Sequence, residues 1–245
     1  MAIKEKDFIE IEYTGKLKED GFIFDTTSAE IAKENNLFDE KKIYKPIVIC
    51  VGEAQILQGL DKELIGKELN KSYTIELEAE KAFGKKNAKL LKLVPTNIFR
   101  KQRIEPMPGL QVNVDGMFGI IKTVTGGRTI VDFNHPLSGK DVSYDVKVNK
   151  LITDPVQKLK SFITLELGLK DLKVELKEQT ATIELNLPEQ IKESFEKKLL
   201  ELVPEVKKLE FSGKKPEKPK NNNERSKYNE NTIKRDDGAM DWNSR

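Results

Sequence analysis

The chain has very little of what metal centres and disulfide frameworks require. Among 245 residues there is one cysteine, Cys50, and one histidine, His135. A single cysteine cannot form an intrachain disulfide, and two soft ligands far apart in the sequence are too few for a zinc or nickel site. We therefore expect no metal and no cofactor. Cys50 lies between Ile49 and Val51 and is interpreted as a small buried hydrophobe, and His135 is assigned a turn or packing role.

Long apolar runs and a strong net charge are absent as well. The longest apolar run, residues 46–51, is far shorter than the roughly 20 residues of a membrane-spanning helix. The first residues mix both charges, so we expect no secretory signal and a cytoplasmic protein without membrane partners. Lysine and arginine number 43 and aspartate and glutamate 41, a net charge of +2. This balance argues against a specific nucleic-acid partner, because phosphate binding usually leaves a dense basic patch.

Alternating apolar residues predict strands in the first half of the chain. Residues 9–13, 73–77 and 142–148 alternate with the period of half-buried strands. Leu60 and Leu64 lie one helical turn apart and are followed by Gly66, which can end a helix. One short helix is therefore expected to cross the sheet.

A middle segment, residues 88–131, behaves as a separate small β-rich unit. Strand alternation at residues 110–114 is followed by Asp115-Gly116, a strong hairpin signal, and Gly126-Gly127 marks a second turn. Small β hairpins are expected here.

The composition changes again after residue 152. Asp154 before Pro155 marks the start of a helix that Gly168 ends, alternation predicts strands at 172–176 and 181–187, a second helix begins at Pro188, and residues 209–211 suit a last strand. Residues 153–212 thus predict a small α+β domain of order α-β-β-α-β. The tail, residues 213–245, is rich in Lys, Asn, Glu and Pro and predicts a flexible extension.

Four short motifs resemble those of the FKBP-type peptidyl-prolyl isomerases. They are Tyr13-Thr14-Gly15, Asp20-Gly21-Phe22-Ile23-Phe24-Asp25, Gln55-Ile56-Leu57-Gln58-Gly59-Leu60 and Ala82-Phe83-Gly84. Residues 131–139, Val-Asp-Phe-Asn-His-Pro-Leu-Ser-Gly, resemble the return crossing of the longer SlyD-type and archaeal members, which carry a second domain inserted in the flap. The resemblance covers residues 1–152 and implies an α+β fold, with an antiparallel sheet wrapped on a short helix.

The changes in sequence pattern and the FKBP resemblance together predict the domains. Residues 1–87 and 132–152 would form the isomerase domain, 88–131 the insert-in-flap domain, 153–212 the C-terminal domain and 213–245 the tail.

The resemblance implies an apolar pocket for a proline ring. Its site residues would be Tyr13, Phe24, Asp25, Ile56, Leu57, Leu60, Phe83 and Tyr144. Leu60 would be the floor, where many relatives have tryptophan, and a backbone N–H of Ile56 or Leu57 would hold a substrate carbonyl. Asp25 would orient the substrate electrostatically, because rotation about the imide bond moves no proton. Any one of these aromatics would be a core residue in most β proteins, so the assignment depends on their combination.

Two functions remain open. In the first, the chain is a prolyl isomerase and chaperone that binds unfolded or partly folded polypeptides with X-Pro bonds. In the second, it is a chaperone or assembly module with a vestigial isomerase pocket, whose C-terminal domain sets location or oligomeric state and could form a homo-oligomer. Macrolide binding is a weak expectation, since Phe83 replaces the tyrosine of animal drug-binding relatives.

Overall fold

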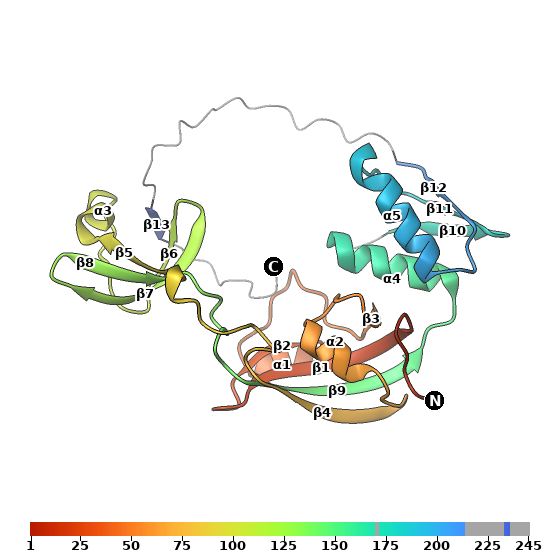
Figure 1. The fold of residues 1–245 in the computed structure, drawn as a ribbon, viewed down its shortest axis with the longest axis horizontal. Coiled ribbons are helices and arrows are strands. Elements are labelled where there is room, and N and C mark those ends of the chain that lie inside the picture. The colour runs from red at the N-terminus through yellow and green to blue at the C-terminus, as the bar shows by residue number, and fades with distance from the viewer. Residues whose placement is uncertain (170–171, 214–232, 236–245) are drawn as a thin grey trace. The chain divides into compact units, whose positions relative to one another are not determined.

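The computed structural model describes residues 1–169, 172–213 and 233–235 (Figure 1). The chain divides into two compact units. The first unit consists of Met1–Ala82 and Asp141–Asn221, and the second unit of Phe83–Lys140 and Asn222–Arg245. None of the helices in the described ranges has the length and apolar character needed to cross a membrane.

A five-stranded antiparallel sheet forms the base of the first unit. Its strands are β1 (Phe8–Leu17), β2 (Ile23–Thr26), β3 (Ile47–Cys50), β4 (Lys71–Leu77) and β9 (Val142–Leu151). The order is β2-β1-β9-β4, and β3 pairs with the first half of β1 while β2 pairs with its second half. The strands predicted at 9–13, 73–77 and 142–148 are confirmed.

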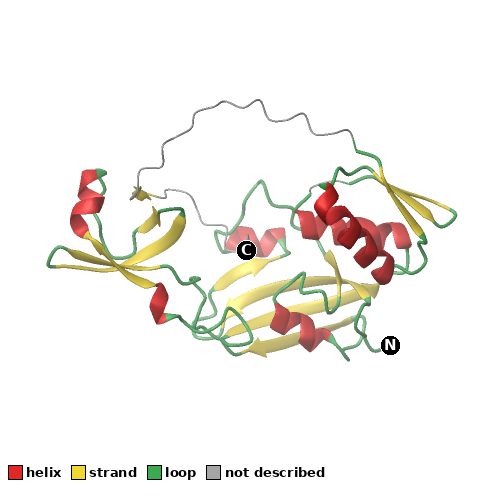
Figure 2. Cartoon of the chain, turned by 45° about the horizontal axis from the view of Figure 1, so that its top comes forward, coloured by secondary structure: helices red, strands yellow, loops and turns green. Residues whose placement is uncertain are grey.

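One short helix lies against this sheet, as predicted (Figures 1 and 2). Helix α2 (Gln58–Leu64) contacts β4 and buries Leu60 and Leu64. The chain leaves it through Gly66, whose φ of 82° is accessible to glycine at little cost. A second helix, α1 (Ala29–Glu34), was not predicted, because Ala32 is its only buried side chain and no apolar periodicity marks it.

The C-terminal segment, residues 153–212, has the predicted α-β-β-α-β order. Its elements are α4 (Pro155–Leu167), β10 (Val174–Lys177), β11 (Thr180–Ile183), α5 (Glu189–Leu202) and β12 (Lys208–Phe211). The Asp154 side chain accepts a hydrogen bond from Gln157 N, and Gly168 ends α4 in the left-handed conformation. The strand expected over 181–187 stops at Ile183, because the N–H of Leu185 bonds back to the Ile183 carbonyl.

This C-terminal segment shares a hydrophobic core with the sheet. Phe8, Cys50 and Ile152 belong to one buried cluster with Leu159, Phe162, Ile163, Leu172, Ala181, Ile183, Leu199, Leu202, Val203, Val206 and Leu209. Cys50 is fully buried, and burial above all raises the pKa of its thiol to about 12. Its interpretation as a small buried hydrophobe is confirmed, since a neutral thiol is a poor nucleophile.

The second unit is built on another five-stranded sheet. Its order is β13 (Ile233–Arg235), β6 (Gln111–Val114), β7 (Met117–Thr125), β8 (Arg128–Asp132) and β5 (Leu91–Pro95), all pairs being antiparallel. A single turn of 3-10 helix, η1 (Ala88–Leu90), precedes β5, and α3 (Thr96–Lys101), not predicted from the sequence, follows it. The hydrophobic core of the second unit includes Phe99, Ile104, Val112, Val114, Ile121 and Val131.

The hairpin signals of the second unit are confirmed. Asp115 and Gly116 join β6 to β7 with φ values of 52° and 81°, as a two-residue hairpin turn requires. Of the tail predicted as flexible, residues 214–232 and 236–245 lie outside the described residues. Residues 233–235 form β13, which extends the sheet at β6.

Candidate functional site

Three aromatic rings meet on the sheet of the first unit. Tyr144 on β9 lies opposite Gly15 on β1 in the strand register. The Tyr13 and Tyr144 ring centroids are 6.0 Å apart with a 61° interplanar angle, and those of Phe24 and Tyr144 are 5.8 Å apart at 85°. These are edge-to-face contacts, the arrangement that aromatic quadrupoles favour. Strands β1, β2 and β9 thus each contribute one ring to the same cluster.

The packing of the rings explains why the Tyr-Thr-Gly motif has glycine at position 15. A Cβ atom at this position would lie 2.8 Å from both Phe24 Cζ and Tyr144 Cε1. Only a residue without a side chain leaves room for both rings in their observed places.

Asp25 is held at the margin of the ring cluster by Tyr13. The Tyr13 hydroxyl donates a hydrogen bond of 2.9 Å to Asp25 Oδ2. Burial, followed by the nearby Asp25 charge, raises the pKa of Tyr13 and likewise that of Tyr144 above the ordinary range. Both phenols therefore keep their protons at neutral pH, and the proton of Tyr13 is the one donated to Asp25.

The loop of residues 51–57, between β3 and α2, carries two further predicted site residues. Ile56 and Leu57 are half-buried there, and Leu60, on the first turn of α2, is 1% exposed. The loop is fixed from the helix side by Asp61, which is 2% exposed and accepts hydrogen bonds from Gly52 N at 3.0 Å and Ala54 N at 2.9 Å.

Asp61 was missed by the sequence reasoning. Its only signal is a carboxylate next to Leu60 on the buried face of a helix. Gly59, within the same turn, also has a structural reason, since a Cβ there would collide with the carbonyl oxygen of Lys81. The motif around Leu60 therefore encodes close packing as well as an apolar floor.

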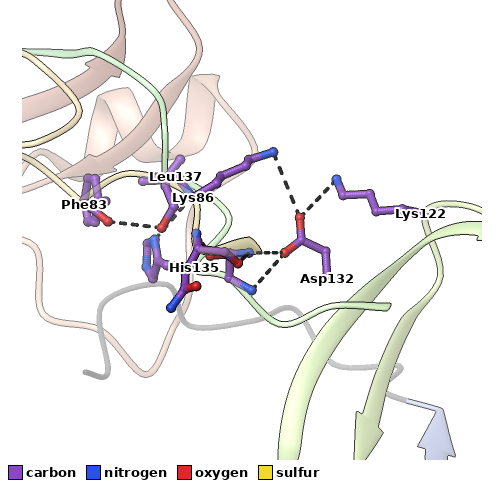
Figure 3. A network of polar contacts seen from close by, with 9 residues as sticks. Phe83, Lys86, Lys122, Asp132, His135 and Leu137 are labelled. Carbon is purple, nitrogen blue, oxygen red and sulfur yellow. Dashed lines mark hydrogen bonds and ion pairs between the residues drawn. The ribbon is translucent and has the colours of Figure 1, made fainter. Parts of the chain in front are cut away.

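Phe83 belongs to the second unit, where it packs on His135. The two rings are stacked, with centroids 4.7 Å apart and planes 1° from parallel (Figure 3). The Ser138 hydroxyl donates to the Phe83 carbonyl at 3.1 Å, and Leu137 N donates to His135 Nδ1 at 3.2 Å. The packing role expected for His135 is confirmed. No group of three or more potential metal ligands occurs in the part of the chain that the structure describes.

Asp132 ties together the two segments that lead into and out of the insert. It is 6% exposed, and its Oδ1 accepts from Asn134 N at 2.9 Å and Asn134 Nδ2 at 2.7 Å. Lys86 and Lys122 approach its Oδ2 at 4.0 and 3.9 Å (Figure 3). Asn134 also bonds to both the N–H and the carbonyl of Asn87. Residues that flank the insert on its two sides, Asn87 and Asn134, are therefore neighbours.

Comparison with known proteins decides the family. The family described as FKBP-type peptidyl-prolyl cis-trans isomerase matches residues 1–100, and the family described as FKBP26, IF domain, matches residues 92–137. A short-type peptidyl-prolyl cis-trans isomerase of Methanocaldococcus jannaschii is 32% identical over 146 residues, which are 60% of this chain and 92% of the relative. The chain belongs to the FKBP-type peptidyl-prolyl cis-trans isomerase family.

Other FKBP-type relatives come from bacteria. An FKBP-type 16 kDa peptidyl-prolyl cis-trans isomerase of Escherichia coli is 30% identical over 152 residues, again 60% of this chain and 92% of the relative. The SlyD isomerase of Haemophilus influenzae is 26% identical over 117 residues, 46% of this chain and 60% of the relative. The predicted FKBP resemblance and isomerase class are confirmed.

Within this FKBP-type chain, direct contacts bring together four of the eight predicted site residues: Tyr13, Phe24, Asp25 and Tyr144. Leu60 is a buried residue of α2, and Ile56 and Leu57 lie in the loop before that helix. Phe83 is placed in the second unit and packs there on His135. The roles of all eight in catalysis stay predictions.

Proposed function

We propose that the chain catalyses cis-trans rotation of X-Pro bonds in polypeptides, with the proline ring held against Tyr13, Phe24, Leu60 and Tyr144. The observation that carries the proposal is the cluster of three edge-to-face rings with the Tyr13–Asp25 hydrogen bond at its margin. The barrier to rotation is about 18–20 kcal/mol. Twisting breaks the amide resonance and makes the bond less polar, so an apolar surface binds the twisted form better than water does.

In this mechanism Asp25 orients the substrate and takes no proton. Tyr13 fixes one carboxylate oxygen of Asp25, which stabilises a single position of the charge. A backbone N–H of Ile56 or Leu57 would hold the carbonyl that precedes the proline. Each tenfold gain in rate needs only about 1.4 kcal/mol of extra binding to the twisted state, so a few such contacts are sufficient for turnover.

We further propose that the insert, residues 88–131, captures unfolded segments and supplies them to the site. Three apolar side chains on β5 and β8, Leu91, Leu93 and Ile130, are 45%, 56% and 37% exposed, and Leu93 lies opposite Ile130 in the register. Met107, Met117 and Phe118 of the same insert are exposed as well. Exposed apolar groups gathered on one small unit are typical of a surface that binds other chains.

Deleting the insert tests this division of labour. Because Asn87 is bonded to Asn134, residues 88–131 can be replaced by a short glycine linker without stretching the ends. For a protein whose refolding is limited by proline isomerisation, we expect the catalysed rate to fall tenfold or more. A tenfold loss corresponds to an activation free energy higher by about 1.4 kcal/mol. Turnover of a tetrapeptide should stay within about twofold, since the ring cluster is untouched.

Two other outcomes would contradict parts of the proposal. Equal loss on both substrates would reject the role of the insert. The absence of any rate enhancement by the intact chain on a tetrapeptide, at micromolar protein, would reject the isomerase itself and favour an assembly module with a vestigial pocket.

A further inference from the structure

The loop of residues 51–57 is held from two sides. From one side, Asp61 of α2 accepts the backbone N–H groups of Gly52 and Ala54. From the other side, the loop is contacted by helices α4 and α5 of the C-terminal segment. The loop therefore has two separate sets of partners, one on α2 and one on the C-terminal helices.

An ion pair makes the first contact with the C-terminal segment. Lys198 Nζ on α5 lies 2.8 Å from Glu53 Oε2, and the Glu53 side chain is only 19% exposed. The same ammonium group lies 5.2 Å from the centroid of the Phe162 ring, which is itself buried. The hydrogen bond and charge of Glu53 raise the pKa of Lys198. Lys198 is thus positioned by a buried ring on one side and by the loop on the other.

Gln55 makes the second contact, two residues further along the loop. Its Nε2 donates to the Phe162 carbonyl on α4 at 3.4 Å, and its Oε1 accepts from Cys50 N at 2.8 Å. One side chain therefore bridges strand β3, the loop and α4. The next residues, Ile56 and Leu57, are the ones assigned to the substrate carbonyl.

Helices α4 and α5, which carry these contacts to the loop, are packed into the core they share with the sheet. Both helices lie beyond the residues that the two family models match, 1–100 and 92–137. The match to the Methanocaldococcus jannaschii protein uses 92% of that relative but only 60% of this chain, so most of the remaining 40% has no counterpart in it.

We propose that the C-terminal segment positions the proline-site loop, with Lys198 as the positioning residue for Glu53 and the Phe162 carbonyl for Gln55. This inference depends on the proposed function, since it assigns the effect to peptide turnover. Holding the loop in one conformation aims the Ile56 and Leu57 amides before substrate arrives, and preorganised donors stabilise a transition state at no further cost.

A pair of lysine variants tests the proposal. Lys198→Met removes the ion pair to the loop. Lys158→Met is the matched control, because Lys158 on α4 also forms an ion pair, 2.7 Å to Glu205, and also approaches a ring, Phe8, at 5.9 Å. Neither Glu205 nor Phe8, these two partners of Lys158, belongs to the loop of residues 51–57.

We expect Lys198→Met to lower kcat/KM on a tetrapeptide three- to fivefold, and Lys158→Met to leave it unchanged at a similar loss of melting temperature. Glu53→Gln should produce the same loss as Lys198→Met, and the double variant no more than either, because both remove one contact. Lys198→Arg should restore turnover, since a guanidinium can also pair with the carboxylate.

Hydrogen exchange separates failure of this inference from failure of the proposed function. In Lys198→Met the amides of Gly52 and Ala54 should exchange faster than in the wild type and in Lys158→Met. An active wild type with an equally active, folded Lys198→Met would overturn the positioning role. If the wild type itself is inactive, unchanged exchange at these two amides would still overturn it, and faster exchange would support the anchoring independently of catalysis.

Discussion

Adding one methyl group at Gly15 should disable the proposed proline site while the chain stays folded. The new Cβ would lie 2.8 Å from Phe24 Cζ and from Tyr144 Cε1, whereas carbon atoms in optimal contact are about 3.5–4.0 Å apart. Phe24 and Tyr144 are 6% and 4% exposed, so neither ring can turn outward freely. Such overpacking typically costs about 1–3 kcal/mol.

The same displacement predicts the effect on catalysis. Gly15→Ala should lower the free energy of unfolding by about 2 kcal/mol, the middle of the range for overpacked cores. Because both displaced rings are proposed to contact the proline, kcat/KM on a tetrapeptide should fall at least tenfold. The measurements are urea unfolding and a protease-coupled or NMR exchange assay on the same preparation.

Gly119→Ala is the matched control in the second unit. A Cβ there would lie 2.7 Å from Val131 Cγ1 and 2.8 Å from Phe133 Cδ1, a clash of the same size. It should destabilise the insert and leave tetrapeptide turnover unchanged. A folded Gly15→Ala variant with wild-type kcat/KM would refute the assignment of the rings to substrate binding.

Two further predictions concern Tyr13 and Cys50. Tyr13→Phe removes the hydrogen-bond donor to Asp25. A hydrogen bond to a charged group contributes about 1.5–3 kcal/mol, so the free energy of unfolding in urea should fall by an amount near the lower value at this half-buried site. The KM for a tetrapeptide should rise several-fold, and an unaltered KM would remove Asp25 from substrate binding. The pKa of Cys50 is raised from 9.0 to about 12 in the folded chain, so above pH 9 the unfolded chain loses this proton first and the free energy of unfolding should fall as pH rises to 12. Cys50→Ala should reduce that slope in urea titrations at pH 8, 9.5 and 11, and parallel slopes would contradict the burial argument.

Periodicity predicted the elements whose apolar residues face one core. Strands β1, β4 and β9 and helix α2 were found from alternation or a single i, i+4 pair, and α4 from its cap at Asp154 and its stop at Gly168. Helices α1 and α3 have six residues each and too few buried side chains to produce a pattern. Strand β13 lies in a polar tail and exists through pairing with β6, a distant contact that local sequence does not encode.

The candidate site shows the same limit. Resemblance supplied the residue types, but the contact between Tyr13 and Asp25 depends on the pairing of β1 with β2, whose register shifts at Gly15/Lys16. Asp61 was not found because its donors, Gly52 and Ala54, point at it only through positive φ values of 92° and 52° in the loop. Both features are set by backbone geometry that apolar patterning does not report.

The core shared by Phe8, Cys50 and the C-terminal helices has a consequence for how this chain can be cut or fused. Truncation after Ile152 would expose to water the side of β3 that the helices cover. The apolar side chains of Phe8 and Cys50 would then be uncovered, and exposed apolar surface promotes self-association. Residues 1–152 therefore cannot be moved unchanged into another protein. A fusion would need polar substitutions on the exposed side of β3, or would have to include helices α4 and α5.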